Sequence, residues 1–141
     1  LRKRIAQREP ARARRRSPLE DLELEYEKLR TKETLQSLGT NAHNTQLSHA
    51  VRLYIQRTTS LMALEMTEDE ICYAIRRKSE LQPFENLRVM FDHASIAKFA
   101  KSRIDEEMID DDLERLNEVI RASRVPETAP SPPPNEARGD A

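Results

Sequence analysis

The sequence predicts an all-α fold, a small bundle of about five short amphipathic helices. Apolar residues recur three and four positions apart through its central part, which is the spacing of helices with one buried face. The 141 residues include only two Gly and no Trp, and 4% are aromatic. Hairpin turns use Gly and strands favour aromatic residues, so this composition argues against a β-sandwich or barrel.

The first helix is expected from residue 18 to near Gly39. Ser17 is a suitable N-cap, and Pro18 suits the first helical position because its missing N–H needs no partner there. Gly39 can adopt the left-handed conformation that often ends a helix. The buried face of this helix is expected to contain Leu22, Tyr26 and Leu29.

A second helix is expected from about Thr45 to the pair Thr58-Thr59, with a buried face of Leu47, Val51, Tyr54 and Ile55. A third begins after Thr67, because Thr67 and Glu70 have the spacing of a capping box, in which each side chain accepts a hydrogen bond from a free backbone N–H. The buried face of the third helix is expected to contain Ile71, Ala74 and Ile75.

Two further helices complete the domain. Pro83 is expected to open the fourth, whose apolar face contains Phe84, Leu87, Met90 and Phe91. A short segment with Ile96 and Phe99 follows, and the last helix starts around Asp105, a suitable cap. Its expected buried face contains Ile109, Leu113, Leu116 and Ile120. Its acidic first half and basic second half complement the helix macrodipole.

Charge and proline content divide the chain into three parts. Residues 1–17 carry eight basic side chains and one acid, residues 18–124 have a net charge of −6, and residues 125–141 contain five of the eight prolines. We expect a cationic arm at 1–17, a folded domain at 18–124 and a disordered Pro-rich tail at 125–141, which cannot bury enough surface to offset its chain entropy. No apolar run approaches the roughly 18 residues of a membrane span, so the chain itself is expected to be soluble.

The residue types that carry catalytic and metal chemistry form no motif. The three histidines and the lone Cys72 lack metal-ligand spacing, and the acidic run of the last helix lacks the pattern of a calcium loop. Gly39 and Gly139 are the only glycines, too few for a phosphate-binding loop. We expect no cofactor and no metal, and an interaction domain rather than an enzyme. The aromatic residues are expected on buried faces rather than on a base-stacking platform: Tyr26, Tyr54, Tyr73, Phe84, Phe91 and Phe99.

Several short motifs follow one another between residues 51 and 121. They are Arg52-Leu53-Tyr54-Ile55, the stretch from Met66 to Ile71, Lys98-Phe99-Ala100 and a closing acidic helix. Their order resembles the C-terminal cytosolic helical domain of the Bat (aerotolerance) group and its small single-pass relatives. These are bacterial inner-membrane proteins encoded beside MoxR-type AAA+ ATPases and von Willebrand A-domain proteins. Residues 18–29 resemble the family's first helix after its membrane span. The family usually has Ser-Pro where this chain has Ile104-Asp105.

The resemblance implies a role at the cytoplasmic face of a bacterial inner membrane, with the membrane span upstream of Leu1. The chain would dock partners of a MoxR/von Willebrand A-domain assembly. The expected docking surface is the acidic face of the last helix, with Asp110, Asp111, Asp112 and Glu114. The residues expected to determine the fold rather than contact a partner are Arg52, Tyr54, Thr67, Glu70 and Phe99.

The cationic arm suits this placement. Basic residues beside a span hold that flank in the cytoplasm and attract anionic lipid headgroups by about 1 kcal/mol each. The cations expected to do so are Arg2, Lys3, Arg4, Arg8, Arg12, Arg14, Arg15 and Arg16. A solvated leader and a transit peptide are alternatives. So is a small helical nucleic-acid-binding protein whose arm neutralises phosphates, although the negative charge of residues 18–124 argues against it.

Overall fold

The computed structural model describes residues 15–99 and 103–124. Every regular element in these two ranges is helical, which confirms the predicted all-α class. The α-helices are α2 (Pro18–Leu29), α3 (Lys32–Leu38), α4 (Thr40–Thr58), α5 (Glu68–Arg77), α6 (Arg88–Ala97) and α7 (Glu106–Arg124), joined in part by the 3₁₀ helices η1 (Ala63–Glu65) and η2 (Ser79–Leu87). The predicted tail and most of the predicted arm lie outside the described residues.

The predicted first helix is two helices. Ser17 and Glu20 form a capping box at the start of α2, as its sequence indicates, but α2 ends at Leu29. Thr31 then begins α3, because its side chain accepts a hydrogen bond from the backbone N–H of Thr34 at 3.2 Å. The N-cap at Thr31 therefore divides into two the segment that was expected to form a single helix up to Gly39.

Gly39 separates α3 from α4 and has a φ of 83°. Its N–H donates to the carbonyl oxygen of Leu35 at 2.8 Å, and its own carbonyl accepts from the N–H of His43 at 2.9 Å. One residue thus ends one helix and begins the next, so α4 starts at Thr40 and not at the predicted Thr45.

The capping box of Thr67 and Glu70 opens α5, as predicted. The prediction for Pro83 is wrong: this residue lies within η2, and the fourth long helix, α6, starts at Arg88. Ile96, expected in a separate segment, belongs to α6. The predicted start of the last helix is confirmed. Asp105 lies just before α7, and its Oδ1 accepts a hydrogen bond from the backbone N–H of Met108 at 2.9 Å.

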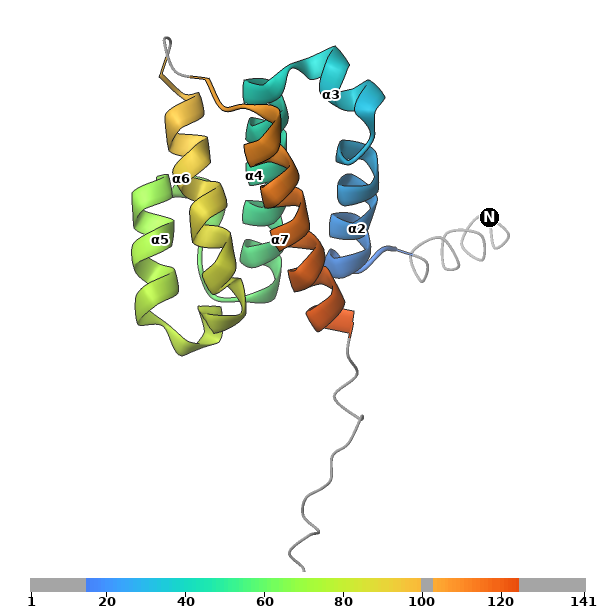
Figure 1. Ribbon diagram of the computed structural model, residues 1–141. Coiled ribbons are helices and arrows are strands. Elements are labelled where there is room, and N and C mark those ends of the chain that lie inside the picture. The colour runs from blue at the N-terminus through green and yellow to red at the C-terminus, as the bar shows by residue number, and fades with distance from the viewer. Residues whose placement is uncertain (1–14, 100–102, 125–141) are drawn as a thin grey trace, which may run out of the picture.

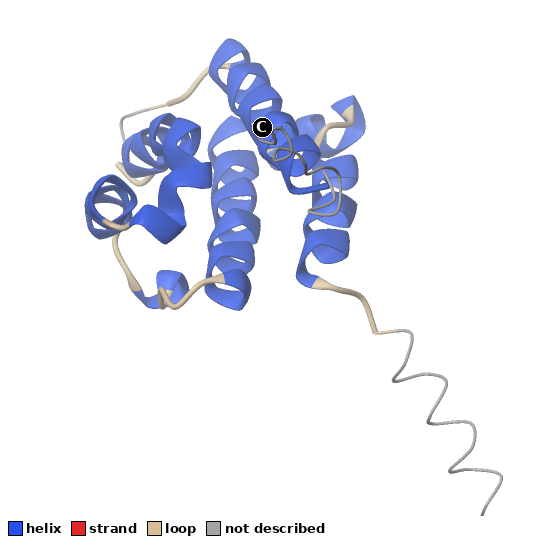
Figure 2. Ribbon diagram, turned by 90° about the horizontal axis from the view of Figure 1, so that it is seen from below, coloured by secondary structure: helices blue, strands red, loops and turns tan. Residues whose placement is uncertain are grey.

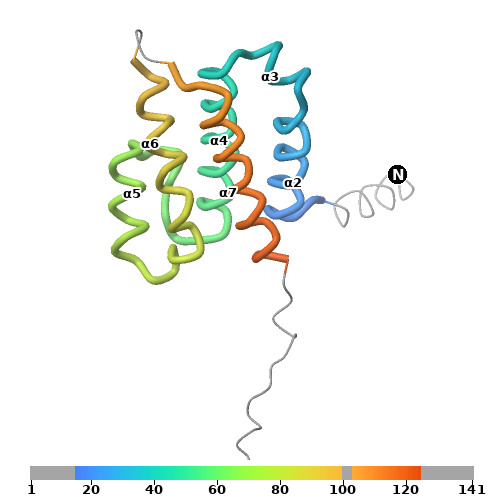
Figure 3. The backbone as a smooth tube through the Cα atoms, in the orientation of Figure 1, coloured from blue at the N-terminus to red at the C-terminus, as the bar shows by residue number. Residues whose placement is uncertain are grey.

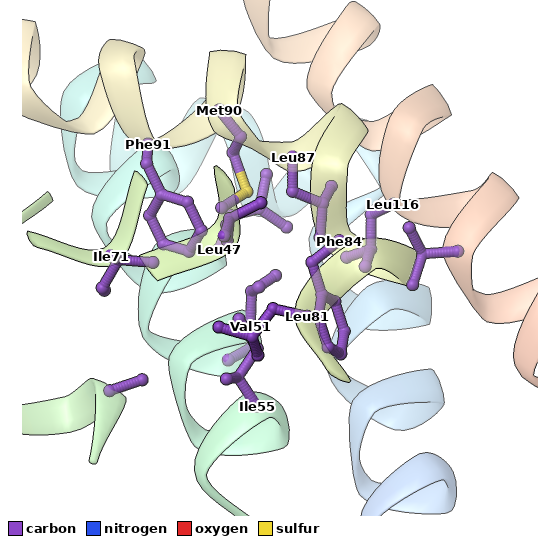
Figure 4. Packing of buried hydrophobic residues seen from close by; sticks show 14 of the residues in the cluster. Leu47, Val51, Ile55, Ile71, Leu81, Phe84, Leu87, Met90, Phe91 and Leu116 are labelled. Carbon is purple, nitrogen blue, oxygen red and sulfur yellow. The ribbon is translucent and has the colours of Figure 1, made fainter. Parts of the chain in front are cut away.

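The central helix is α4, which packs against α2, α3, α6 and α7 (Figure 1). The tube in Figure 3 shows α5 and α6 on one side of α4 and α2 on the other, and Figure 2 shows the same bundle from below. Leu47, Val51 and Ile55 of α4 are almost fully buried among side chains from α5, η2, α6 and α7 (Figure 4). Replacing any one of the three by alanine should cost about 1–5 kcal/mol, with the smaller values expected for Val51.

None of the helices in the described ranges combines the length and the apolar character needed to cross a bilayer.

Candidate interaction surfaces

Arg52 of α4 is the centre of a buried polar cluster, here called the Arg52 clamp. Its guanidinium donates hydrogen bonds to the carbonyl oxygens of Ala63, 3.0 Å away, and of Met66, and its Nη2 lies 2.7 Å from Oε2 of Glu68. Its Nε donates to the hydroxyl of Ser48 at 3.3 Å. Only 11% of the Arg52 side chain and 8% of the Glu68 side chain are exposed. The clamp fastens the segment before α5 onto α4.

The second carboxylate oxygen of Glu68 accepts from Nζ of Lys98, 2.9 Å away, beyond the end of α6. Burial works against ionisation of Glu68, but the hydrogen bond from Lys98 and the charges of Lys98 and Arg52 outweigh it and lower its pKa. Glu68 therefore stays charged and joins α4, α5 and the end of α6. Each of the three short motifs that carry the resemblance supplies one charged residue to this junction: Arg52, Glu68 and Lys98.

Other motif residues also have roles in the fold. The backbone N–H of Thr67 donates to Oε1 of Glu70 at 2.9 Å, and the N–H of Glu70 donates to the Thr67 hydroxyl at 3.1 Å. The ring of Tyr54 meets that of Phe84 edge to face, with centroids 6.0 Å apart. The capping box predicted for Thr67 and Glu70 is present, and Arg52 and Tyr54 both make contacts within the fold.

Phe99 is the exception among these residues. It is 64% exposed, although its motif predicts a buried aromatic ring that stabilises the fold. Val89 and Ile96, seven residues apart on α6, are also more than one-third exposed. Val89 and Ile96, at a spacing of seven, fall on one side of α6, and Phe99 follows two residues after the helix ends. We refer to Val89, Ile96 and Phe99 as the α6 stripe.

The acidic residues of α7 do not form one face. Asp110, Asp111 and Glu114 are exposed as predicted, but Asp112 has no exposed surface. Its Oδ2 lies 2.7 Å from Nδ1 of His93 on α6, and its Oδ1 accepts from Nη1 of Arg115 at 3.0 Å. Burial raises the pKa of Asp112, although His93 and Arg115 act in the opposite direction. Asp112 therefore ties α7 to α6 and cannot belong to the docking surface predicted for it.

The described part of the cationic arm is its last three residues. Nε of Arg16 lies 2.6 Å from one carboxylate oxygen of Asp21, and Nη1 of Arg57 lies 2.5 Å from the other. The hydrogen bonds from Arg16 and Arg57 lower the pKa of Asp21. Arg16 is thus paired with Asp21 of α2, whose other oxygen is bound by Arg57 of α4, and both Arg15 and Arg16 are exposed. The other predicted arm cations lie outside the described residues: Arg2, Lys3, Arg4, Arg8, Arg12 and Arg14.

The outer side of α5 exposes a second aromatic residue. Tyr73, predicted on a buried face, is 56% exposed, and the guanidinium carbon of Arg77 lies 5.3 Å from the centre of its ring. An open hollow of about 1070 Å³ runs beside this helix, and Cys72, Tyr73, Arg76 and Arg88 are among the residues that line it.

Metal-ligating and nucleophilic residues do not come together in residues 15–99 and 103–124, since no three His, Cys, Asp or Glu side chains are placed to hold a metal ion. The thiol of Cys72 is buried beside the carbonyl oxygen of Arg88, 3.7 Å from Sγ. Burial raises the pKa of Cys72 to about 11. The thiol therefore packs as a small apolar group, as its sequence neighbours indicate.

Comparison of the chain with models of known protein families, with curated proteins and with solved structures gives no match. The resemblance to the Bat group stays a prediction.

Proposed function

We propose that residues 18–124 form a protein-interaction domain, the cytosolic end of a membrane-anchored component at the bacterial inner membrane. Its partner in this proposal is a MoxR-type AAA+ ATPase or a von Willebrand A-domain protein. The observation that carries the proposal is the exposure of Phe99 within a motif whose neighbouring residue, Lys98, serves the fold through Glu68. A large aromatic residue that contributes little to the core is typical of an interface anchor.

The surroundings of Phe99 favour a protein partner. Ile96 and Val89 extend the apolar surface along α6, and single exposed apolar residues are common whereas aligned ones mark contact sites. The exposed carboxylates of Asp110, Asp111 and Glu114 lie on the neighbouring helix α7.

A binding experiment with purified proteins tests this proposal. The full chain is titrated with the MoxR-type ATPase and the von Willebrand A-domain protein of the same genome, by isothermal calorimetry. We expect one of them to bind, and Phe99→Ala to weaken binding by about 10-fold or more while the melting temperature stays the same. Leu24→Ala is the matched control, since Leu24 is 52% exposed on α2. Lack of binding to both proteins at about 100 µM, or equal affinity of the Phe99 variant, would refute the proposal.

The membrane part of the proposal has a separate test. The full chain is sedimented with vesicles of anionic lipid, beside a variant in which Arg2, Lys3, Arg4 and Arg8 are replaced by glutamine. Loss of about four cations should reduce binding by two to three orders of magnitude at low salt. Arg16 is left unchanged because it pairs with Asp21. Equal sedimentation of the two chains would remove the lipid-facing role of the arm.

A further inference from the structure

The outer face of α5 has charges arranged symmetrically about an aromatic residue. Asp69 and Glu70 lie four and three residues before Tyr73, and Arg76 and Arg77 lie three and four residues after it. All five side chains are exposed. At spacings of three and four they share one side of the helix. We refer to these five residues as the α5 face.

This helix lies at the edge of the bundle. It packs mainly against α6 and η2, and Figure 1 shows it farthest from α2. The opposite side of α5 supplies Ile71, Ala74 and Ile75 to the core. The α5 face is therefore open to another molecule along its whole length, and the hollow beside it leaves space for side chains of that molecule.

We propose that the α5 face pairs with the α5 face of a second copy of this chain, in an antiparallel arrangement about a two-fold axis at Tyr73. A two-fold axis there brings Asp69 opposite Arg77 of the second copy and Glu70 opposite Arg76, and each pair occurs twice. The two Tyr73 rings meet at the axis. An interface of this kind must be complementary to itself, and the sequence of the α5 face meets that condition at every position.

The helix macrodipole accounts for acids at the start of α5 and bases at its end. The macrodipole does not explain why an aromatic ring, Tyr73, is exposed midway between these charges. It also does not explain why the acids and the bases stand at equal sequence distances from Tyr73. In addition, no ion pair joins Asp69, Arg76 or Arg77 to another residue in the described part of the chain. These charges are available to a partner, and the guanidinium of Arg77 also lies against the ring of Tyr73 in the same chain.

The occupant is a second copy rather than a bilayer or an acidic peptide. An anionic lipid surface would attract Arg76 and Arg77 but repel Asp69 and Glu70 on the same face. A uniformly acidic segment would meet the same repulsion. A contact limited to one helix from each chain is smaller than a standard interface of about 1,600 Å², so we expect a weak dimer, with a Kd of about 10–100 µM at low salt.

Sedimentation equilibrium of the full chain, from about 5 to 500 µM, tests the pairing. The wild type should form a dimer as its concentration rises. Asp69→Arg and Arg77→Glu should each place like charges opposite one another and raise the Kd by about 10-fold or more. An equimolar mixture of these two variants should dimerise again as a heterodimer, because both pairs then have opposite signs. The cap residue Glu70 is left unchanged.

One control variant and one further variant separate pairing of the two α5 faces from a general effect of charge. Asp110→Arg reverses an exposed charge on α7 and should leave dimerisation unchanged. Tyr73→Ser retains all four charges and should weaken the dimer. A wild type that stays monomeric at 500 µM, or a mixture of the two reversed variants that stays monomeric, would overturn the proposal. Its failure would not affect the proposed docking at Phe99, since the two surfaces share no residue.

Discussion

Replacing Arg52 by alanine would remove the centre of the clamp that joins α4, η1 and α5. The change removes the Arg52 donor from the carbonyl oxygens of Ala63 and Met66, of which Ala63 keeps the backbone N–H of Met66, and leaves the largely buried carboxylate of Glu68 with Lys98 alone. Removing one partner of a buried ion pair costs about 3–5 kcal/mol. Because a whole domain has about 5–15 kcal/mol of stability, the variant should lose a large part of its free energy of unfolding.

The assay is urea unfolding followed by far-ultraviolet circular dichroism, with a thermal melt on the same samples. For a domain of this size, a loss of about 3 kcal/mol corresponds to a fall in Tm of roughly 12 °C or more. The matched control is Arg57→Ala, which removes an exposed partner of Asp21 while Arg16 remains. We expect that control to cost less than about 1 kcal/mol.

A double-mutant cycle completes the experiment. Glu68→Gln retains the shape of the side chain and removes its charge, so Arg52→Ala should cost less in that background than in the wild type. If Arg52→Ala costs no more than Arg57→Ala, or if the cycle shows no coupling, the clamp contributes little to stability and our account of the motif residues is wrong.

Three more predictions concern single residues. Burial raises the pKa of Asp112, so its contribution to stability is most favourable at low pH and is lost as pH rises through that raised pKa. The free energy of unfolding of Asp112→Asn, measured with urea at pH 7, should therefore equal or exceed that of the wild type. If the excess stability of the variant over the wild type grows toward about pH 4, the prediction is contradicted. Gly39→Ala should cost about 1–3 kcal/mol in the same assay through strain alone, because φ is 83° and no atom lies within 4 Å of an added Cβ. Cys72, with a pKa raised from 9.0 to about 11, should react with a disulfide reagent at least about 100-fold more slowly in the folded chain than in urea, and similar rates would refute its burial.

The helical class and the starts of α2, α5 and α7 could be predicted from the sequence because they depend on local signals. Ser17, Thr67 and Asp105 each accept a backbone hydrogen bond within three residues, and such caps are visible in the sequence. The break at Thr31 was missed although Thr is a favoured N-cap residue, because the first helix was expected to continue to Gly39. Pro83 suits the first turn of an α-helix, but it also fits the 3₁₀ helix in which it lies.

The candidate surfaces could be predicted only in part, because they depend on which neighbours cover a side chain. An aromatic residue on an apolar stripe gives the same pattern whether a helix packs on it or not, so Tyr73 and Phe99 were wrongly assigned to the interior. Asp112 had a usable signal: it lies three residues after Ile109 and four before Leu116, on the buried stripe. Its acidic neighbours concealed that position, and its partner His93 is 19 residues away.

The two ends of the folded domain lie at the same end of the bundle. Arg124, at the end of α7, donates to the carboxylate of Glu23 on α2 at 2.7 Å, and Figure 1 shows the start of α2 and the end of α7 on the lower side. The end of α6 lies at the upper side, where the Ala97 carbonyl accepts from Asn41 near the start of α4. The 19 residues of α7 span about 28 Å between these levels. Phe99, two residues beyond the end of α6, therefore lies at the opposite end of the bundle from both ends of the folded domain, so a partner bound at Phe99 would be separated from whatever adjoins those ends by about the length of α7.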